Sequence, residues 1–202
     1  KTLYMRLREA TLGEFRPMSI MRTNTRTGDK FEGQTVEFSP GDKSSTVDAI
    51  KEIMREHPGE PIIVLTHSKK FANKAAVDLG GLAYTGAQTD AQKAEAERAF
   101  KAGDVKVLVG TEAMCEGLDG LQHLCHIGII ASRTGRNYMT GQFIGRVARR
   151  GQEREVLFYE LVRRDTLDTF MRKQGKPTKG IIERAVTKEL MLTGAKAIPV
   201  SK

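Results

Sequence analysis

The sequence predicts an α/β protein of three layers: a mostly parallel sheet with helices on both of its faces, followed by a C-terminal helical extension. Three observations support this fold class. Short apolar runs with many β-branched residues, such as residues 61–66 and 105–109, are typical of strands buried on both faces. Helical patterns separate these runs, and strands that alternate with helices indicate a parallel sheet. The 202 residues are enough for one substantial core and an appendage.

The segment before this region, residues 1–44, is expected to form a helix and then a hairpin or linker. Residues 1–16 place apolar side chains on one side of a helix. Residues 18–40 contain two short strand-like segments around a Thr-Gly-Asp-Lys turn, which predicts a hairpin or an ordered loop. Residues 45–48, Ser-Thr-Val-Asp, form a capping box that opens the first helix of the α/β region.

The α/β region is expected to span residues 45–165, and a C-terminal helical brace residues 166–202. The further elements of the α/β region are a helix over 69–79, a short strand over 82–84, a capped helix over 89–102, a strand over 126–131, an arginine-rich helix that Gly151 ends, and a last strand over 156–162. In the brace we expect two helices, over 166–174 and 181–192, joined by a polar link.

The charge balance points to a polyanionic partner. Lys and Arg number 33 against 25 Asp and Glu, which gives a net charge of +8 and a pI near 9.6. A basic excess of this size most often accompanies nucleic-acid binding. Eight arginines lie between residues 133 and 164. Aromatic residues are few and Trp is absent, so we expect contacts with the nucleic-acid backbone rather than stacking on bases.

The remaining composition narrows the class of protein. No run of about 20 apolar residues exists, so no membrane span is predicted. Two cysteines are too few for a disulfide framework and suggest an intracellular, reducing setting rather than secretion. The spacing of Cys115, His123, Cys125 and His126 fits no zinc pattern, and no metal site is predicted. The chain begins without an initiator Met or a signal peptide, and we expect it to be a fragment or processed product.

The most informative segment is residues 142–152, Gln-Phe-Ile-Gly-Arg-Val-Ala-Arg-Arg-Gly-Gln. On a helix, Gln142, Arg146 and Arg149 fall within about 40° of one another, while the apolar side chains take the opposite face. Guanidinium groups suit phosphate because they are planar, permanently charged and bidentate. Taken alone, the segment fits a solvated basic helix face equally well.

Hydroxyls, glycines and charged groups follow several predicted strands. In an open parallel sheet the ligands gather at the carboxyl ends of the strands, so we expect these residues to share one edge. The set is Thr66, Ser68, Thr85, Gly86, Thr111, Glu112, Arg133 and Arg136. Ser and Thr in such loops also cap the helices that follow, a role compatible with ligand binding.

The ordered set of motifs resembles the second RecA-like lobe of superfamily-two helicases and translocases over residues 45–165. Residues 62–68 are similar to motif IV, residues 84–86 and 100–111 to the run before motif V, Glu116-Gly117-Leu118-Asp119 to motif V, and residues 142–152 to motif VI. The Arg-Gly-Gln ending and the residues after position 163 resemble Swi/Snf-type translocases, and the short chain resembles phage versions of that group. Glu116 departs from the Arg or Gly that many helicases carry there.

The resemblance implies roles at the nucleotide. Arg149 would be the arginine finger, with Arg146 beside it on the phosphates, and Gln142 would orient them or relay between the two sites. Gly117 and Asp119 of motif V are also assigned to the nucleotide. Asp119 would accept from a ribose hydroxyl or pair with a motif VI arginine; an internal salt bridge is the alternative.

The resemblance also implies a grip on nucleic acid. Thr111, Gly86 and Ser68 would touch the sugar-phosphate backbone of the tracked strand, and for Thr111 a helix cap is the alternative. Thr66, Thr85, Glu112, Arg133 and Arg136 are assigned to the same contact surface.

The sequence has neither a GxxxxGK[ST] phosphate loop nor an Asp-Glu box. We therefore expect ATP with Mg²⁺ to be held by a first RecA-like lobe N-terminal to Lys1 in the same protein, and this chain alone to be inactive as an ATPase. The predicted function is the C-terminal motor lobe of an ATP-dependent helicase or translocase, with DNA favoured and RNA still open. The alternative is a stand-alone nucleic-acid-binding module without an ATP role.

Overall fold

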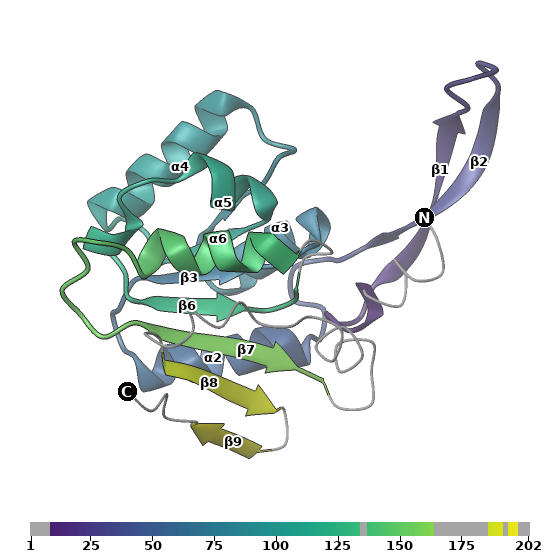
Figure 1. Cartoon of the computed structure of the whole chain (residues 1–202). Helices are drawn as coiled ribbons and strands as arrows, with labels where there is room; N and C mark the ends of the chain where they lie inside the picture. The colour runs from purple at the N-terminus through teal and green to yellow at the C-terminus, as the bar shows by residue number, and fades with distance from the viewer. Residues whose placement is uncertain (1–8, 134–136, 164–185, 192–193, 198–202) are drawn as a thin grey trace.

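The structure, a computed structural model, describes residues 9–133, 137–163, 186–191 and 194–197 (Figure 1). Its centre is a seven-stranded sheet of order β4-β5-β3-β6-β7-β8-β9. The strands are β3 (Ile62–Leu65), β4 (Leu82–Tyr84), β5 (Val107–Gly110), β6 (Ile127–Ile130), β7 (Leu157–Val162), β8 (Val186–Met191) and β9 (Gly194–Ala197). All neighbours pair in parallel except β8 and β9, which confirms the mostly parallel sheet.

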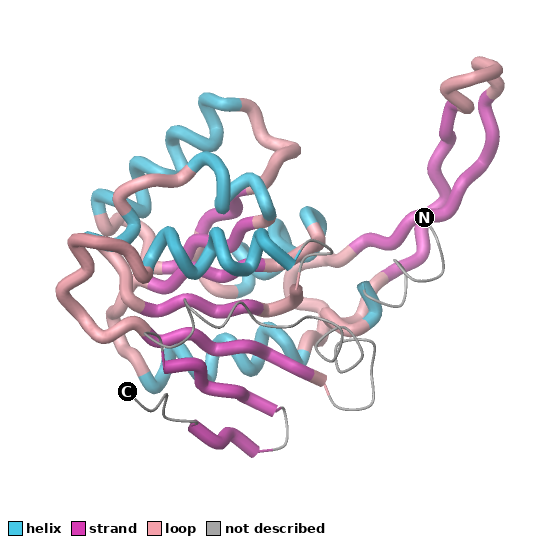
Figure 2. The backbone as a smooth tube through the Cα atoms, viewed as in Figure 1, coloured by secondary structure: helices cyan, strands magenta, loops and turns pink. Residues whose placement is uncertain are grey.

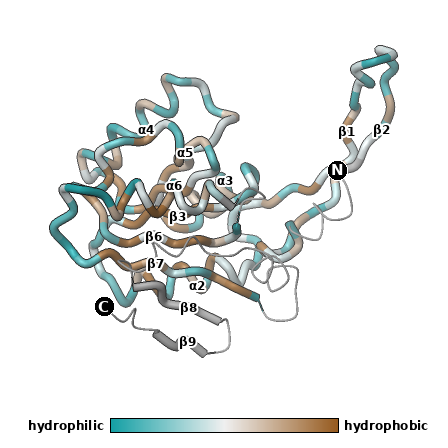
Figure 3. The backbone as a smooth tube through the Cα atoms, in the orientation of Figure 1, coloured by the Kyte–Doolittle hydropathy of each residue, from teal (hydrophilic) through white to brown (hydrophobic). Residues whose placement is uncertain are grey.

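Helices cover both faces of the sheet (Figure 2). The helices α2 (Ser45–Glu56) and α3 (Lys69–Asp78) lie on one face, and α4 (Asp90–Ala102), α5 (Glu112–Gly117) and α6 (Asn137–Val147) on the other. Alternate residues of one strand enter two separate cores: Ile62 and Val64 pack with α2 and α3, whereas Ile63 and Leu65 pack with α4 to α6. Burial on both faces is why these strands are continuous apolar runs, and Figure 3 shows the hydrophobic residues concentrated there.

An antiparallel hairpin projects from this lobe (Figures 1 and 2). Strands β1 (Arg16–Thr23) and β2 (Lys30–Glu37) pair along their whole length, from Arg16↔Glu37 to Thr23↔Lys30. The hairpin predicted within residues 18–40 is confirmed. The helix predicted over residues 1–16 is wrong at its C-terminal end, because the described helical residues stop at Ala10. Arg16 instead joins the hairpin, and Pro17, which follows it, lacks the N–H that a helix interior needs.

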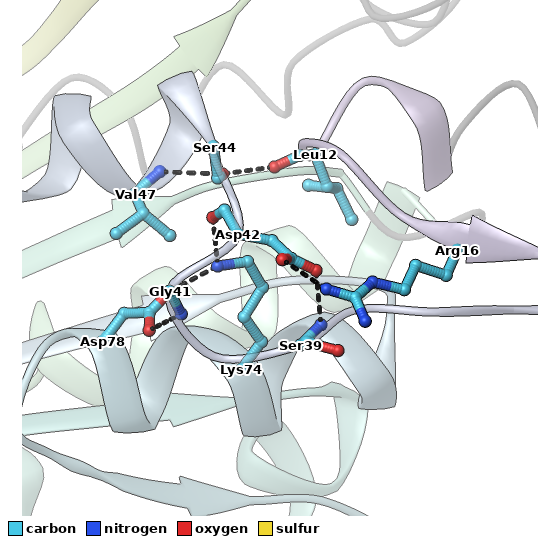
Figure 4. A network of polar contacts seen from close by, with 9 residues as sticks. All are labelled: Leu12, Arg16, Ser39, Gly41, Asp42, Ser44, Val47, Lys74 and Asp78. Atoms are coloured by element: carbon cyan, nitrogen blue, oxygen red, sulfur yellow. Dashed lines mark hydrogen bonds and ion pairs between the residues drawn. The ribbon is translucent and has the colours of Figure 1, made fainter.

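A buried lysine ties the segment after the hairpin to the lobe (Figure 4). The ammonium of Lys74, on α3, donates to the carbonyl oxygen of Asp42 at 2.7 Å and pairs with Asp78. Asp78 also accepts from the backbone N–H of Gly41 at 2.8 Å. The Asp42 carboxylate accepts from Arg16 of β1, with 3.3 Å between Nη2 and Oδ1. A charge that is buried in this way needs several partners, and these partners fix the base of the hairpin.

A second tie runs through the start of α2. The N-cap is Ser44, whose Oγ accepts from the N–H of Val47 at 3.2 Å. The cap therefore lies one residue before Ser45, and the reciprocal capping box predicted at residues 45–48 is not formed, because Val47 has no side-chain acceptor. The same hydroxyl donates to the carbonyl oxygen of Leu12 at 2.5 Å. That second bond holds the N-terminal segment, and the neighbouring Ser45 lacks it, which explains the shift.

The C-terminal residues differ from the prediction where the structure describes them. A helix over 181–192 is wrong, because Val186–Met191 forms β8 and Gly194–Ala197 forms β9. Strand β7 would otherwise expose a row of unpaired backbone groups, and β8 covers them in parallel register. The helix predicted over 166–174 lies outside the described residues, and the division at residues 44 and 165 stays a prediction. No helix in the described ranges is long and apolar enough to cross a membrane.

Candidate functional site

The loops after four parallel strands meet at one edge of the sheet, as predicted. The N–H of Thr66, after β3, donates to Gly110 at the end of β5 at 2.9 Å. The N–H of Thr111 donates to Tyr84, at the end of β4, at 3.1 Å, and the N–H of Ala131, after β6, to Leu65 at 2.9 Å. This edge is where a ligand of an open α/β sheet is expected.

The arginine-rich helix is shorter than predicted. Helix α6 ends at Val147, so Arg149 and Arg150 lie in the turn that follows it. Gln152 provides the reason, because its side-chain amide donates to the carbonyl oxygens of Val147 at 3.4 Å and Cys125 at 3.0 Å. Gly151 then takes φ +95°, a conformation that suits glycine after a helix end.

Arg149 and Arg146 still converge on Asp119. The Nη1 atom of Arg149 lies 2.5 Å from Oδ1 of Asp119, and Nη1 of Arg146 lies 3.6 Å from the same oxygen. The side chains of Asp119 and Arg149 are 71% and 49% exposed. The pKa of Asp119 is lowered, first by the hydrogen bond from the N–H of Gly120 and next by the charge of Arg149. Pairing with a motif VI arginine, one of the roles implied for Asp119, is present.

Arg146 is more enclosed than Arg149, at 26% exposed. Its Nε donates to the carbonyl oxygen of Cys115 at 2.8 Å, and its Nη2 to that of Glu116 at 3.1 Å. These are carbonyls of the last turn of α5, where a cation satisfies groups that have no partner within the helix. Arg146 therefore fixes α6 to α5 and to the motif V residues that follow.

Gly117 is required by packing. A Cβ atom at this position would lie 2.5 Å from the hydroxyl of Tyr84, which is buried at the end of β4. Glycine thus allows the end of α5 to approach β4 closely. Its predicted place near the nucleotide follows only from the resemblance.

Three of the predicted hydroxyl groups support the loops from inside. Thr66 is fully buried, with its Oγ1 3.0 Å from the Oγ of Ser132 after β6. Thr85 is buried and accepts from the N–H of Ala87 at 3.4 Å. Ser68 caps α3 by accepting from the N–H of Phe71 at 3.3 Å.

Thr111 differs from these three. It occupies the N-cap position of α5 but makes no side-chain cap hydrogen bond, so the capping alternative is not seen. Glu112, the first residue of α5, is half-buried.

Arg133 is committed to an internal ion pair. It forms a bidentate contact with Glu160 of β7, in which Nη2 lies 2.9 Å from Oε2. This hydrogen bonding raises the pKa of Arg133 above its ordinary value. Glu160 pairs in register with Ile130, directly before the Arg133 loop, which brings the two side chains together. We therefore remove Arg133 from the predicted nucleic-acid contacts, and Arg136 lies outside the described residues.

Lys69 is a candidate that the sequence analysis missed. It is exposed at the first position of α3, and its Nζ lies 3.7 Å from where a Cβ on Gly86 would be. The same point is 3.9 Å from Ala113 of α5. Lys69 therefore lies where the loops after β3, β4 and β5 meet, and its place directly after Ser68 was the available signal. Gln142 is exposed on α6.

Among the described residues, no group of three or more His, Cys, Asp and Glu side chains could hold a metal ion. Cys115 and Cys125 are free and buried, and burial raises the pKa of both thiols to about 12.

A comparison with protein families matches the helicase conserved C-terminal domain over residues 45–151, more than half of the chain. The chain belongs to this family. The match spans the strand-end loops, Asp119 and both motif VI arginines. A comparison with curated protein sequences found no match.

Solved structures support the same RecA-like helicase lobe. The C-terminal part of the Fun30 ATPase domain has a TM-score of 0.59 at 16% identity, covering 67% of this chain and 47% of that one. A DEAD box protein from Methanococcus jannaschii has a TM-score of 0.55 at 18% identity, and the match covers 72% of this chain and 39% of that protein. The Hef helicase domain of Pyrococcus furiosus has a TM-score of 0.50 at 19% identity, and the match covers 67% of this chain and 29% of that domain. The chain thus matches less than half of each, and the likeness establishes the fold alone.

Proposed function

We propose that this chain is the C-terminal motor lobe of an ATP-dependent DNA helicase or translocase, and that it works with a first RecA-like lobe that holds Mg·ATP. The observation that carries the proposal is the exposed guanidinium of Arg149, which lies just after the end of α6 and beside Asp119 of motif V. The family match and the absence of a phosphate loop in the sequence support it. The Swi/Snf affinity, and with it DNA rather than RNA, rests on the sequence resemblance and on the Fun30 likeness. The phage likeness and an intracellular location also remain proposals.

The residues around Arg149 suit a triphosphate. ATP would supply the phosphoryl group and the free energy of its hydrolysis. Arg149 provides a planar, permanently charged donor that is half-exposed, and Gln142 adds an exposed amide nearby on α6. Gly117 and Asp119 complete the proposed nucleotide-facing group, with Asp119 available to a ribose hydroxyl when Arg149 leaves it.

The two motif VI arginines have different roles in this proposal. Arg149 is held by one exposed carboxylate, and exposed ion pairs contribute little to stability, so its guanidinium is free to turn towards a phosphate. Arg146 is held by two backbone carbonyls of α5 and is more buried. Arg149 is therefore the finger, and Arg146 positions the loop that carries Asp119.

The nucleic-acid grip is proposed to centre on the exposed Gly86 and Lys69, with the loop of the buried Thr111 beside them. Thr66, Thr85 and Ser68 shape these loops from beneath through internal hydrogen bonds. Closure and reopening of the two lobes in each cycle would move this grip along the strand.

The test is DNA-stimulated ATP hydrolysis by the two-lobed protein carrying Arg149→Ala. We expect hydrolysis to fall by about a hundredfold or more, because a finger supplied in trans contributes about 10³–10⁵ in turnover. DNA affinity should change little. The matched control is Arg98→Ala on α4, an exposed arginine that pairs with the carboxylates of Glu95 and Asp104. It should leave hydrolysis unchanged.

A stand-alone nucleic-acid-binding module gives the opposite result. In that case Arg149→Ala weakens DNA binding while hydrolysis per bound DNA stays intact. ATP hydrolysis by the 202-residue chain alone, with DNA present, would contradict both readings, since the chain lacks a phosphate loop.

A further inference from the structure

The β1–β2 hairpin is the part of the molecule that the proposed function leaves unexplained. It extends away from the lobe, and among the described strands β1 and β2 pair with each other alone (Figure 1). Three of the five large hydrophobic side chains exposed in the described part of the chain lie on it, including Met21 at 66% and Phe31 at 50%. A hairpin of two strands is marginal on its own, so an exposed one that is firmly held at its base suggests a binding role.

The end of β2 is fixed to the start of α3, near the edge of the sheet where ligands gather. Lys70, in the first turn of α3, donates to the carbonyl oxygen of Val36 in β2 at 2.6 Å. Phe38, just after β2, packs edge-to-face on Phe71 of α3, with 5.7 Å between ring centroids. Because α3 begins directly after the β3 loop, the hairpin starts from the ligand edge. Lys69 faces Gly86 and the next residue holds the hairpin, so the proposed grip and the hairpin are contiguous.

The tip of the hairpin carries the chemistry of a phosphate-binding surface. Residues 22–32 contain Arg22, Arg26 and Lys30 against two carboxylates, Asp29 and Glu32, together with an asparagine and several threonines. Residues 23–32 are all exposed, and Figure 3 shows this end as hydrophilic. Hydroxyls, amides and cations are the groups that contact nucleic-acid backbones.

We propose that the β1–β2 hairpin is a second nucleic-acid contact, which binds the phosphate backbone of DNA beyond the stretch gripped at the strand-end loops. The proposal rests on the nucleic-acid part of the proposed function. Each strand has eight residues, which span about 26 Å at 3.3 Å per residue. DNA rises about 3.4 Å per base pair, so the hairpin lengthens the contact by up to about seven base pairs. Phe31, which pairs with Arg22 and shares its face of the ribbon, would contact sugars or bases beside the phosphates.

The test measures binding of the 202-residue chain to a fluorescent 30-base-pair duplex across a range of KCl concentrations. In Arg26→Gln/Lys30→Gln we expect about tenfold weaker binding at 100 mM KCl. The slope of log K against log salt should become shallower by about 1.8, because each phosphate contact contributes about 0.9. The matched control, Lys51→Gln/Arg55→Gln, removes two exposed cations from α2 and should change the affinity much less. Equal effects in the two variants would overturn the proposal.

A second variant tests the apolar contact with DNA separately from the charge contact. Phe31→Ala should weaken binding by threefold or more without changing the salt slope, since apolar contact releases no counterions. A photo-crosslinker on Thr25→Cys should attach to DNA in the two-lobed protein. Attachment to the first lobe instead would assign the hairpin to contact between lobes and overturn a DNA role.

Failure of this proposal is distinguishable from failure of the proposed function. If Arg149→Ala abolishes hydrolysis but the hairpin variants bind as the control does, the hairpin proposal alone is wrong. If the unaltered chain does not bind DNA, the hairpin proposal falls with the nucleic-acid grip, and hydrolysis still tests the role of Arg149 separately.

Discussion

The lobe formed by residues 45–162 and the β1–β2 hairpin are both built around strands, but they are stabilised differently. In the lobe, β3, β5 and β6 are fully buried between two layers of helices. In the hairpin, β1 is exposed or only half-buried along its length, and its order depends on cross-strand pairing and on the network around Lys74. Burial between two layers of helices stabilises the lobe. The hairpin is held by a few polar contacts at its base, and this leaves its strands exposed for contact with a partner.

The largest expected difference between the two regions is in thiol reactivity. Thr25→Cys at the hairpin tip should react with iodoacetamide at pH 8 like an unstructured thiol. Cys115 and Cys125 should react at least about a thousandfold more slowly, because a pKa of about 12 instead of about 8.5 lowers the thiolate fraction by that factor. Mass spectrometry of timed samples measures both rates, and fast modification of Cys115 would show that α5 packs loosely.

Breaking the network around Lys74, which connects the hairpin to the lobe, should give the next largest effect. Lys74→Met leaves the Asp78 carboxylate without its buried cation and removes the tie to Asp42, so we expect the free energy of unfolding to fall by about 3–5 kcal/mol. Urea denaturation measures this change. The double variant Lys74→Met/Asp78→Asn should recover part of the loss, since it also removes the unpaired charge. A single variant as stable as the parent chain would mean that the hairpin base is not held by this network.

The smallest effect is the difference in stability between two Gly→Ala substitutions, one in the lobe and one in the hairpin. A Cβ on Gly128 of β6 would lie 2.2 Å from the ring of Phe158, so Gly128→Ala should destabilise the lobe by about 1–3 kcal/mol through overpacking. A Cβ on Gly33 of β2 would meet the flexible side chain of Arg22 at 2.7 Å, which can move. Gly33→Ala should therefore change stability by less than about 0.5 kcal/mol. Thermal melts of both variants measure the two losses of stability. Equal losses would contradict the contrast between a tightly packed lobe and an exposed hairpin.

Much of the lobe could be predicted because its elements carry local signals. The capping box at Thr89 is formed as expected, with Thr89 and Gln92 each accepting from the backbone N–H of the other. The buried strands were recognisable as apolar runs. By contrast, β8 was missed because a parallel edge strand depends on the unpaired side of β7, a partner that lies far from it in sequence.

The candidate site was predictable in its chemistry and less so in its contacts. The motif resemblance brought Asp119 and Arg149 together, and the structure agrees. Sequence alone could not reveal that Arg133 pairs with Glu160, because that contact depends on the register between β6 and β7. It also could not show that Arg146 is held by backbone carbonyls of α5 while Arg149 stays half-exposed, because those contacts depend on the packing of α6 against α5.

By itself the sequence determined the alternation of strands and helices, the family, and the residue types available for phosphate. These features depend on local periodicity and motif order, which are properties of neighbouring residues. The tertiary structure decided which cations are exposed, which are held in internal ion pairs or hydrogen bonds, and where the hairpin points. Those outcomes depend on desolvation and on partners distant in the chain, such as Asp119 for Arg149 and Lys74 for Asp42, which only the packed fold brings within reach.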